Sequence, residues 1–265
     1  WSGQHIILSH LMEIPNADYT NGLHCGYISP IPQIPFNEDF TEDDLRVFIE
    51  AISNDILNWD NMRLLMRSGG VTYASTEVLM KNQPMEVMEK NCCKFISGAN
   101  LCINLTKPER TFPFFNPPGA RGEDTFLSTL LHDRTVLEIL CYAFHDGFSS
   151  YKNILNGVLP IELAPIVADN KAIISRFLSA CIGWVRYKPL LLYITNPAGY
   201  DEEIASMRET LNEISPKLAK YFHDDGFLNI SKELEEYHAN VKKHAELFQL
   251  AQNSWQKLLR DVILR

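Results

Sequence analysis

The sequence predicts a mixed α/β fold that is followed by a helical hairpin at the C-terminus. Residues 136–144 form an apolar run typical of a buried strand. Residues 97–105 alternate apolar and polar side chains, which is the pattern of a strand with one polar face. From residue 201 onward, apolar residues recur every three or four positions, as in helices that pack along a seam. We therefore expect a sheet-containing region, residues 1–160, and a helical C-terminal extension, residues 161–265.

The composition is that of a folded globular protein. At 265 residues and 30.3 kDa, the chain is long enough to bury a substantial core. No window approaches the uninterrupted apolar length of a membrane span, so we expect none. The net charge is −9 and the 24 basic residues are scattered, which argues against nucleic acid as a partner, because phosphate binding needs clustered basic residues.

The six cysteines show no CxxC pair and no Cys/His spacing of a zinc site. Several of them stand among apolar residues, where a free cysteine is usually a small buried side chain. A reducing compartment is the simplest interpretation, and we expect a cytoplasmic location.

The first third of the chain is expected to be irregular before its first helix. Residues 1–36 alternate polar turns with short apolar pieces, and the closely spaced prolines within residues 27–35 indicate an extended connector. Thr41 is placed to cap a helix whose apolar face continues until a stop before Ser68. A short extended piece and a helix are expected within residues 71–80.

The last third is expected to be helical. A largely apolar helix begins near Asp169 and is predicted to stop at Pro189. Asp201 is placed to cap the next helix, and residues 223–226 supply a turn. One final helix, beginning near Ser231, keeps a coiled-coil rhythm to the C-terminus, so that the last two helices form the hairpin.

Two adjacent acids, Glu123 and Asp124, follow an irregular loop and precede apolar residues that fit one side of a helix. Acids at a helix start cap backbone donors, but a cap needs only one acid, so this interpretation explains one of the two. A carboxylate held at the end of a rigid loop is also what general-base chemistry on a hydroxyl requires. Arg121 and Gly122 precede the pair, and the arginine is placed to bind a carboxylate or an anionic substrate group.

His145 follows the strand predicted over residues 136–144. Ligands of α/β folds gather at the carboxyl ends of strands, so a histidine there is placed for function. A turn histidine that bonds to a neighbouring residue is the alternative.

Two further side chains are candidates for substrate binding. The amide of Asn100 pairs a donor with an acceptor, as sugar hydroxyls require, although a polar residue on a solvated strand face needs no such explanation. Phe115 belongs to an aromatic loop that can stack on a sugar, although core packing explains most of that loop equally well.

The order of these motifs resembles the second half of GT-A-type glycosyltransferases: a strand SGANLCINL, a loop, GED at a helix start and a strand ending in HDGF. The resemblance covers roughly residues 70–150 and implies a partial GT-A-like mixed sheet with flanking helices. It implies that Asp124 is the catalytic base with Glu123 as its neighbour. It also implies that His145 ligates a divalent ion, Mn²⁺ or Mg²⁺, which holds the donor diphosphate.

The chain departs from that family in one respect. An Asp-x-Asp motif, whose carboxylates bind the metal and the donor diphosphate, occurs nowhere in the sequence. We therefore expect the catalytic segment to be incomplete at its N-terminus, in keeping with a chain that begins at Trp1, or to have lost donor binding.

The function predicted is that of a hexosyltransferase-like glycosyltransferase, with a nucleotide-sugar donor and the hydroxyl of a carbohydrate or other acceptor as partners. The alternative is a noncatalytic interaction module that forms homo-oligomers or binds partners through its C-terminal helices. A glycoside hydrolase is less well supported, because its two acids flank the scissile bond whereas adjacent side chains usually diverge.

Overall fold

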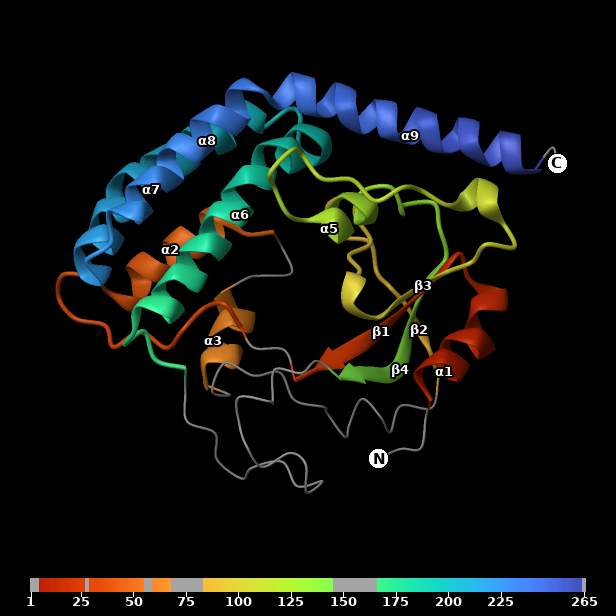
Figure 1. Ribbon diagram of the computed structural model, residues 1–265, viewed down its shortest axis with the longest axis horizontal. Helices are drawn as coiled ribbons and strands as arrows, with labels where there is room; N and C mark the ends of the chain where they lie inside the picture. The colour runs from red at the N-terminus through yellow and green to blue at the C-terminus, as the bar shows by residue number, and fades with distance from the viewer. Residues whose placement is uncertain (1–4, 27–28, 55–58, 68–82, 145–165, 264–265) are drawn as a thin grey trace.

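The computed structural model describes residues 5–26, 29–54, 59–67, 83–144 and 166–263 (Figure 1). In these residues a small mixed sheet lies beside a layer of long helices, so the expected mixed α/β class with a helical C-terminal part is confirmed. The strands are β1 (Tyr19–Cys25), β2 (Met85–Glu86), β3 (Leu101–Ile103) and β4 (Val136–Phe144). The α-helices are α1 (Ile6–Glu13), α2 (Glu42–Ile52), α3 (Trp59–Arg67), α5 (Glu123–Ser128), α6 (Lys171–Thr195), α7 (Tyr200–Phe222), α8 (Asn229–Ala239) and α9 (Val241–Ile263).

The sheet has the order β2-β4-β1-β3, with a parallel central pair and antiparallel edges. β4 has the bounds that its apolar run predicts. β1, which pairs on both sides, falls in the region expected to be turns, and that expectation is wrong. Its sequence, YTNGLHC, contains polar residues and a glycine and lacks regular alternation, so β1 owes its burial to the neighbouring strands rather than to an apolar pattern.

The strand expected over residues 97–105 is much shorter than predicted. Only β3 is extended, and a 3-10 turn, η3 (Gly98–Asn100), precedes it. The expected solvated polar face is also wrong, because Asn100 and Asn104 are buried. Asn104 Nδ2 donates to the backbone oxygen of Ala17 at 2.8 Å, so local side-chain bonds replace part of the strand ladder.

The helix predicted at Thr41 is confirmed at its start. Thr41 Oγ1 accepts from the backbone N–H of Asp44 at 3.1 Å, and the Asp44 carboxylate accepts from the backbone N–H of Thr41 at 2.8 Å, which completes a capping box. The single long helix is wrong, because α2 ends at Ile52 and Ser53 is extended. A second helix, α3, begins at Trp59. The extended piece and helix expected within 71–80 lie outside the described residues.

The later helices also differ from expectation at two points. α6 continues through Pro189, which was expected to stop it. The proline removes one backbone bond, but Val185 and Leu190 on either side are buried in the core and keep the helix intact. The final helix is divided at Asn240, which leaves the helical conformation, and α9 then runs at an angle to α8 (Figure 1). The hairpin expected over residues 201–265 is therefore present only in part: α7 and α8 form it and pack against α6, and α9 is not part of it.

Two hydrophobic clusters meet at α5. The larger cluster joins α2, α3 and the helices from α6 to α9, and it therefore includes residues from both sides of the division predicted at residue 160. The smaller cluster lies under the sheet and includes Tyr19 and Val136. Phe126 belongs to the first cluster and its neighbour Leu127 to the second, and both are fully buried. α5 is consequently held between the sheet and the helical layer.

Candidate functional site

The acidic pair occupies the first turn of α5, as the sequence predicts. The preceding residue, Gly122, is the N-cap and has a left-handed backbone with φ 103°. A Cβ at Gly122 would be strained by that φ and would lie 3.2 Å from the ring of Tyr187. Glycine is therefore required where the loop turns into the helix, and it sets the direction of Glu123 and Asp124.

Asp124 is half-buried, and its carboxylate bonds to two backbone donors. Oδ2 accepts from the N–H of Gly98 at 3.2 Å, and Oδ1 accepts from the N–H of Thr125 at 2.9 Å. In the described part of the chain, no basic side chain forms an ion pair with this carboxylate. Because a carboxylate has about four acceptor positions, Asp124 keeps the capacity to accept a hydrogen bond from a further donor.

Glu123 is engaged in a different way. Its Oε2 accepts from Asn116 Nδ2 at 3.1 Å, on the loop that leads into the helix. That hydrogen bond, together with backbone N–H groups at Glu123 and Gly122 and the charge of Arg121, lowers the pKa of Glu123 despite its partial burial. Glu123 is thus a weakly basic carboxylate that holds the loop, whereas Asp124 faces η3.

Arg121 lies beside the acids and is exposed. Its side-chain stem packs over Gly183 of α6, where an added Cβ would lie 3.1 Å from Arg121 Cδ. Because Gly183 has no side chain, the stem of Arg121 has room to lie against α6. The guanidinium is near enough to Glu123 to help lower the pKa of that carboxyl.

A residue that the sequence did not single out, Asn21 of β1, holds the turn that faces Asp124. Asn21 Oδ1 accepts from the N–H of Ser97 at 3.1 Å, and Nδ2 donates to the backbone oxygens of Ser97 at 2.8 Å and Asn100 at 3.0 Å. These bonds orient η3 so that the N–H of Gly98 points at the Asp124 carboxylate. An asparagine inside a strand is the sequence signal for this role, but the sequence does not predict β1.

Tyr187 of α6 is the second such residue, and its helix was expected only to fill the core. It is 2% exposed, and its hydroxyl makes no hydrogen bond in the described structure, although the backbone of Asn54 is nearby. Burial, and secondarily the charge of Asp124, raises the pKa of Tyr187 far above its usual value. The phenol therefore stays protonated at neutral pH.

The other two candidates for substrate binding turn inward. Asn100 is buried: its Oδ1 bonds to His10 Nε2 at 2.8 Å, and its Nδ2 donates to the backbone oxygen of Leu23 at 2.8 Å. Phe115 packs against the rings of Phe126 and Phe248 with centroids 5.8 and 5.1 Å away. Neither side chain lies open beside Arg121 and the acids. In the same aromatic loop, Phe114 is 49% exposed.

The expected metal ligand, His145, lies outside the described residues. Among the residues that are described, no group of three or more His, Cys, Asp or Glu side chains is arranged to hold a metal ion. The described side chains thus do not by themselves form a site for the expected Mn²⁺ or Mg²⁺.

All six cysteines are free thiols. Burial raises the pKa of Cys25 to about 11 and also raises the pKa of Cys181. Neither thiol is therefore activated as a nucleophile at neutral pH. Within the described helices, none is both long and apolar enough to cross a membrane.

Searches against protein-family models, curated proteins and solved structures find no match to this chain.

Proposed function

We propose that this chain is the acceptor-side part of a glycosyltransferase, which moves a sugar from a nucleotide-sugar donor to a hydroxyl acceptor. The observation that carries the proposal is the carboxylate of Asp124. It is half-buried, it bonds to two backbone N–H groups, and no basic side chain of the described residues neutralises it. Catalysis of this reaction needs a fixed carboxylate that can reach a hydroxyl proton.

In the proposed step, Asp124 accepts the proton of the acceptor hydroxyl. The acceptor oxygen forms a bond to the anomeric carbon of the donor sugar. The bond from that carbon to the diphosphate oxygen breaks, and the nucleoside diphosphate leaves with the electron pair. Asp124 ends the step protonated and later returns the proton to solvent.

Asp124 is favoured over Glu123 as the base for reasons of charge and contact. The pKa of Glu123 is lowered, first by the Asn116 hydrogen bond and then by other groups, so this carboxylate is less basic than an ordinary glutamate. Its bond to Asn116 also ties it to the loop. This division of roles accounts for two adjacent acids where a helix cap requires one.

The surroundings of Asp124 favour a fixed position. The N–H of Gly98 is oriented by the bonds of Asn21 to η3, and α5 is anchored in both hydrophobic clusters. A base held this way is already placed when the acceptor arrives, which is where much of the rate advantage of enzymes originates.

The test is a comparison of Asp124→Asn with Glu123→Gln in the full-length gene product. Release of nucleoside diphosphate and formation of glycosylated product are measured with UDP- and GDP-sugars and a panel of sugar acceptors. Loss of a general base costs roughly 100-fold to 10,000-fold in rate. We expect that loss for Asp124→Asn, and a loss of less than about tenfold for Glu123→Gln, which keeps the amide-compatible bond to the loop.

Both variants replace a carboxyl by an amide of the same shape, so circular dichroism and the thermal midpoint serve as controls for folding. An Asp124→Asn protein that is folded and transfers sugar at the wild-type rate would contradict the assignment. A wild-type protein that turns over none of the nucleotide sugars would contradict the proposed reaction.

A second candidate function, a module that associates through its C-terminal helices, is favoured by one feature of α9. One face of the helix is buried, as at Phe248 and Leu259, but Leu250, Leu258 and Val262 are 58%, 51% and 62% exposed. An antiparallel pairing of two copies centred on Ser254 would set Leu250 opposite Leu258 of the partner. It would also bring Glu246 toward the oppositely charged Arg260 of the partner. The oligomeric state of the protein tests this candidate.

A further inference from the structure

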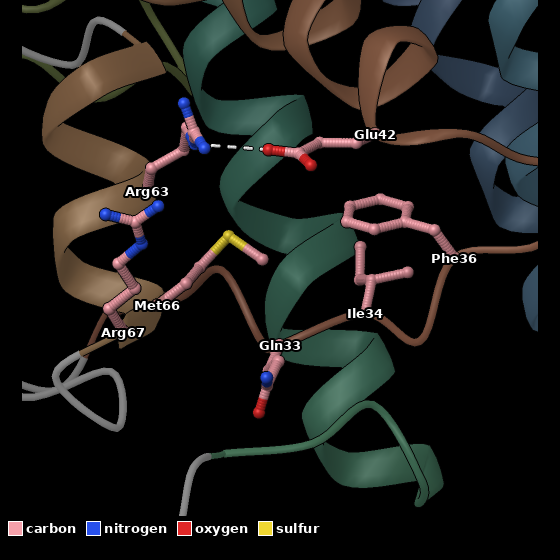
Figure 2. Close-up of a pocket in the computed structure, with 7 residues that line it drawn as sticks. All are labelled: Gln33, Ile34, Phe36, Glu42, Arg63, Met66 and Arg67. Carbon is pink, nitrogen blue, oxygen red and sulfur yellow. Dashed lines mark ion pairs between the residues drawn. The ribbon is translucent and has the colours of Figure 1, made fainter.

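A cavity of about 240 Å³ lies between α3 and the segment that leads into α2 (Figure 2). Its wall combines cationic and apolar side chains. Arg63, Met66 and Arg67 come from α3, and Ile34 and Phe36 come from the connector before α2. None of these residues belongs to the acidic site around Asp124, so the cavity is a separate feature of the molecule.

The cationic wall has more positive charge than negative charge. Arg63 and Arg67 are one helical turn apart, and Figure 2 shows both guanidinium groups on the same side of α3. Arg63 Nε pairs with Glu42 Oε1 at 3.1 Å, and both side chains remain about half exposed. Among the described residues no carboxylate pairs with Arg67. Two neighbouring cations with one anion leave a net attraction for a further anion.

The apolar wall is well fixed. Ile34 is 3% exposed, and the ring of Phe36 contacts the buried ring of Phe40 with centroids 6.1 Å apart. The backbone of the adjacent Gln33 is bonded on both sides, to Ile166 at 2.6 Å and to Ala168 at 3.2 Å. Met66 points toward Phe36 and supplies an adaptable thioether surface (Figure 2). This wall is therefore preformed for an apolar group.

We propose that this cavity binds a small anionic ligand in which a phosphate or carboxylate group is attached to a single ring or a short apolar chain. Arg67 and Arg63 hold the anionic group, and Phe36, Met66 and Ile34 receive the apolar part. The volume of the cavity limits the size of the ligand, because pockets for drug-sized ligands are larger and measure roughly 300–1,000 Å³. Arginine suits the role because its planar guanidinium donates two parallel hydrogen bonds to such oxygens.

The experiment is a calorimetric titration of the protein with phenyl phosphate, with inorganic phosphate and benzyl alcohol as the two half-probes. We expect saturable binding of phenyl phosphate that is tighter than binding of either half-probe. Arg67→Gln should weaken phenyl phosphate binding by at least about tenfold, which is the loss expected for a hydrogen bond to a charged group. Met66→Gln should weaken the binding of phenyl phosphate while leaving the binding of inorganic phosphate unchanged.

The control is Arg46→Gln, which removes the same charge from an arginine of α2 that pairs with Asp43 and Glu50 and does not line the cavity. This variant should bind phenyl phosphate as the wild type does. Equal weakening in Arg46→Gln and Arg67→Gln would mean a nonspecific charge effect and would overturn the proposal. No saturable binding at millimolar phenyl phosphate, or equal affinity for inorganic phosphate, would overturn it as well. Arg67 is exposed, so its replacement is not expected to disturb folding, which circular dichroism checks.

Discussion

The pairing of Asp18 with Arg110 stabilises the start of the central strand. Asp18 is 4% exposed and accepts from Arg110 Nε at 2.6 Å, from Arg110 Nη2 at 2.8 Å and from the N–H of Thr135 at 2.8 Å. The same arginine donates to the backbone oxygen of Asp133 at 2.9 Å. One carboxylate therefore joins the beginnings of β1 and β4 to η4 (Pro108–Arg110).

We expect Asp18→Asn to lower the free energy of unfolding at pH 7 by about 2–3 kcal/mol, since it weakens charged hydrogen bonds at a buried position. Burial alone would raise the pKa of Asp18, but the Arg110 hydrogen bonds, the Thr135 N–H and the Arg110 charge outweigh it and lower the pKa. A lowered pKa means that the stabilisation is fully present above the unfolded-state value, about 3.9, and is lost as the pH falls through the folded-state value.

Urea denaturation between pH 7 and pH 3 measures this difference. The difference in the free energy of unfolding between wild type and Asp18→Asn should be largest at neutral pH and should become smaller below about pH 4. Asp39→Asn is the control, because Asp39 is 70% exposed and its pair with Lys220 lies in solvent. A gap of constant size over the whole range would show that ionisation of Asp18 is not its cause.

At the residue scale, the sequence predicts the position of the two acids but not the residues that surround them. Helix-start patterns are local, so Glu123 and Asp124 fall where expected. The sequence does not predict the roles of Asn21 and Tyr187, because these roles depend on contacts between segments that are distant in the chain. The alternation of residues 97–105 predicts a solvated Asn100, but Asn100 ends the turn η3 and is buried against His10 and β1.

Among the elements, the approach of η3 to β1 leaves no room at Gly22. A Cβ there would lie 2.1 Å from Asn100 Nδ2 and 3.0 Å from Cys141 Sγ. The Asn100 amide cannot retreat easily, because it also bonds to His10 and to the backbone of Leu23. The pairing of β1 with its neighbours is thus coupled to a glycine in the middle of the strand.

Gly22→Ala should therefore destabilise the protein by about 1–3 kcal/mol or more, the usual cost of overpacking together with a disturbed buried network. The matched control is Gly98→Ala in η3, where a Cβ would lie 3.6 Å from Asp124 Cβ, an ordinary contact distance. Thermal and chemical denaturation of the two variants test this. Equal stability of Gly22→Ala and Gly98→Ala would contradict the packing described for β1.

Most helical regions except α1 could be predicted, but the ends of the helices and their divisions could not. The cap at Thr41 and the turn after α7 follow from local side chains. Pro189 did not end α6, and Asn240 did divide the last helix, because tertiary packing decides whether a helix tolerates a lost backbone bond. β1 could not be recognised from its sequence, since a strand that is paired on both sides need not alternate.

For the whole molecule, the mixed α/β class followed from the order of the strand-like and helical patterns. The order of the strands did not, because β1 was not among the strands expected. The apolar rhythm of α9 is visible in the sequence, but it does not show that Phe248 and Leu259 are buried whereas Leu258 and Val262 are exposed.

If the exposed apolar residues of α9, Leu250, Leu258 and Val262, pair two copies, Leu258→Glu should shift the protein from dimer to monomer in sedimentation equilibrium, because a charge would replace an apolar contact. Leu105→Glu, at a residue that is 70% exposed after β3, is the control and should leave the dimer intact. A wild-type protein that is monomeric at all concentrations would rule out this pairing.

The central claim is that Asp124 accepts a proton from the acceptor hydroxyl, and rescue by an external base tests it most directly. The measurement is the rate of sugar transfer by Asp124→Ala with and without added sodium formate, against sodium chloride at equal ionic strength. Removal of the side chain leaves space beside Gly98 that a small carboxylate can enter. We predict that the variant is nearly inactive in chloride and regains activity in proportion to formate. Full activity without formate, or a Glu123→Ala variant that needs formate while Asp124→Ala does not, would contradict the claim.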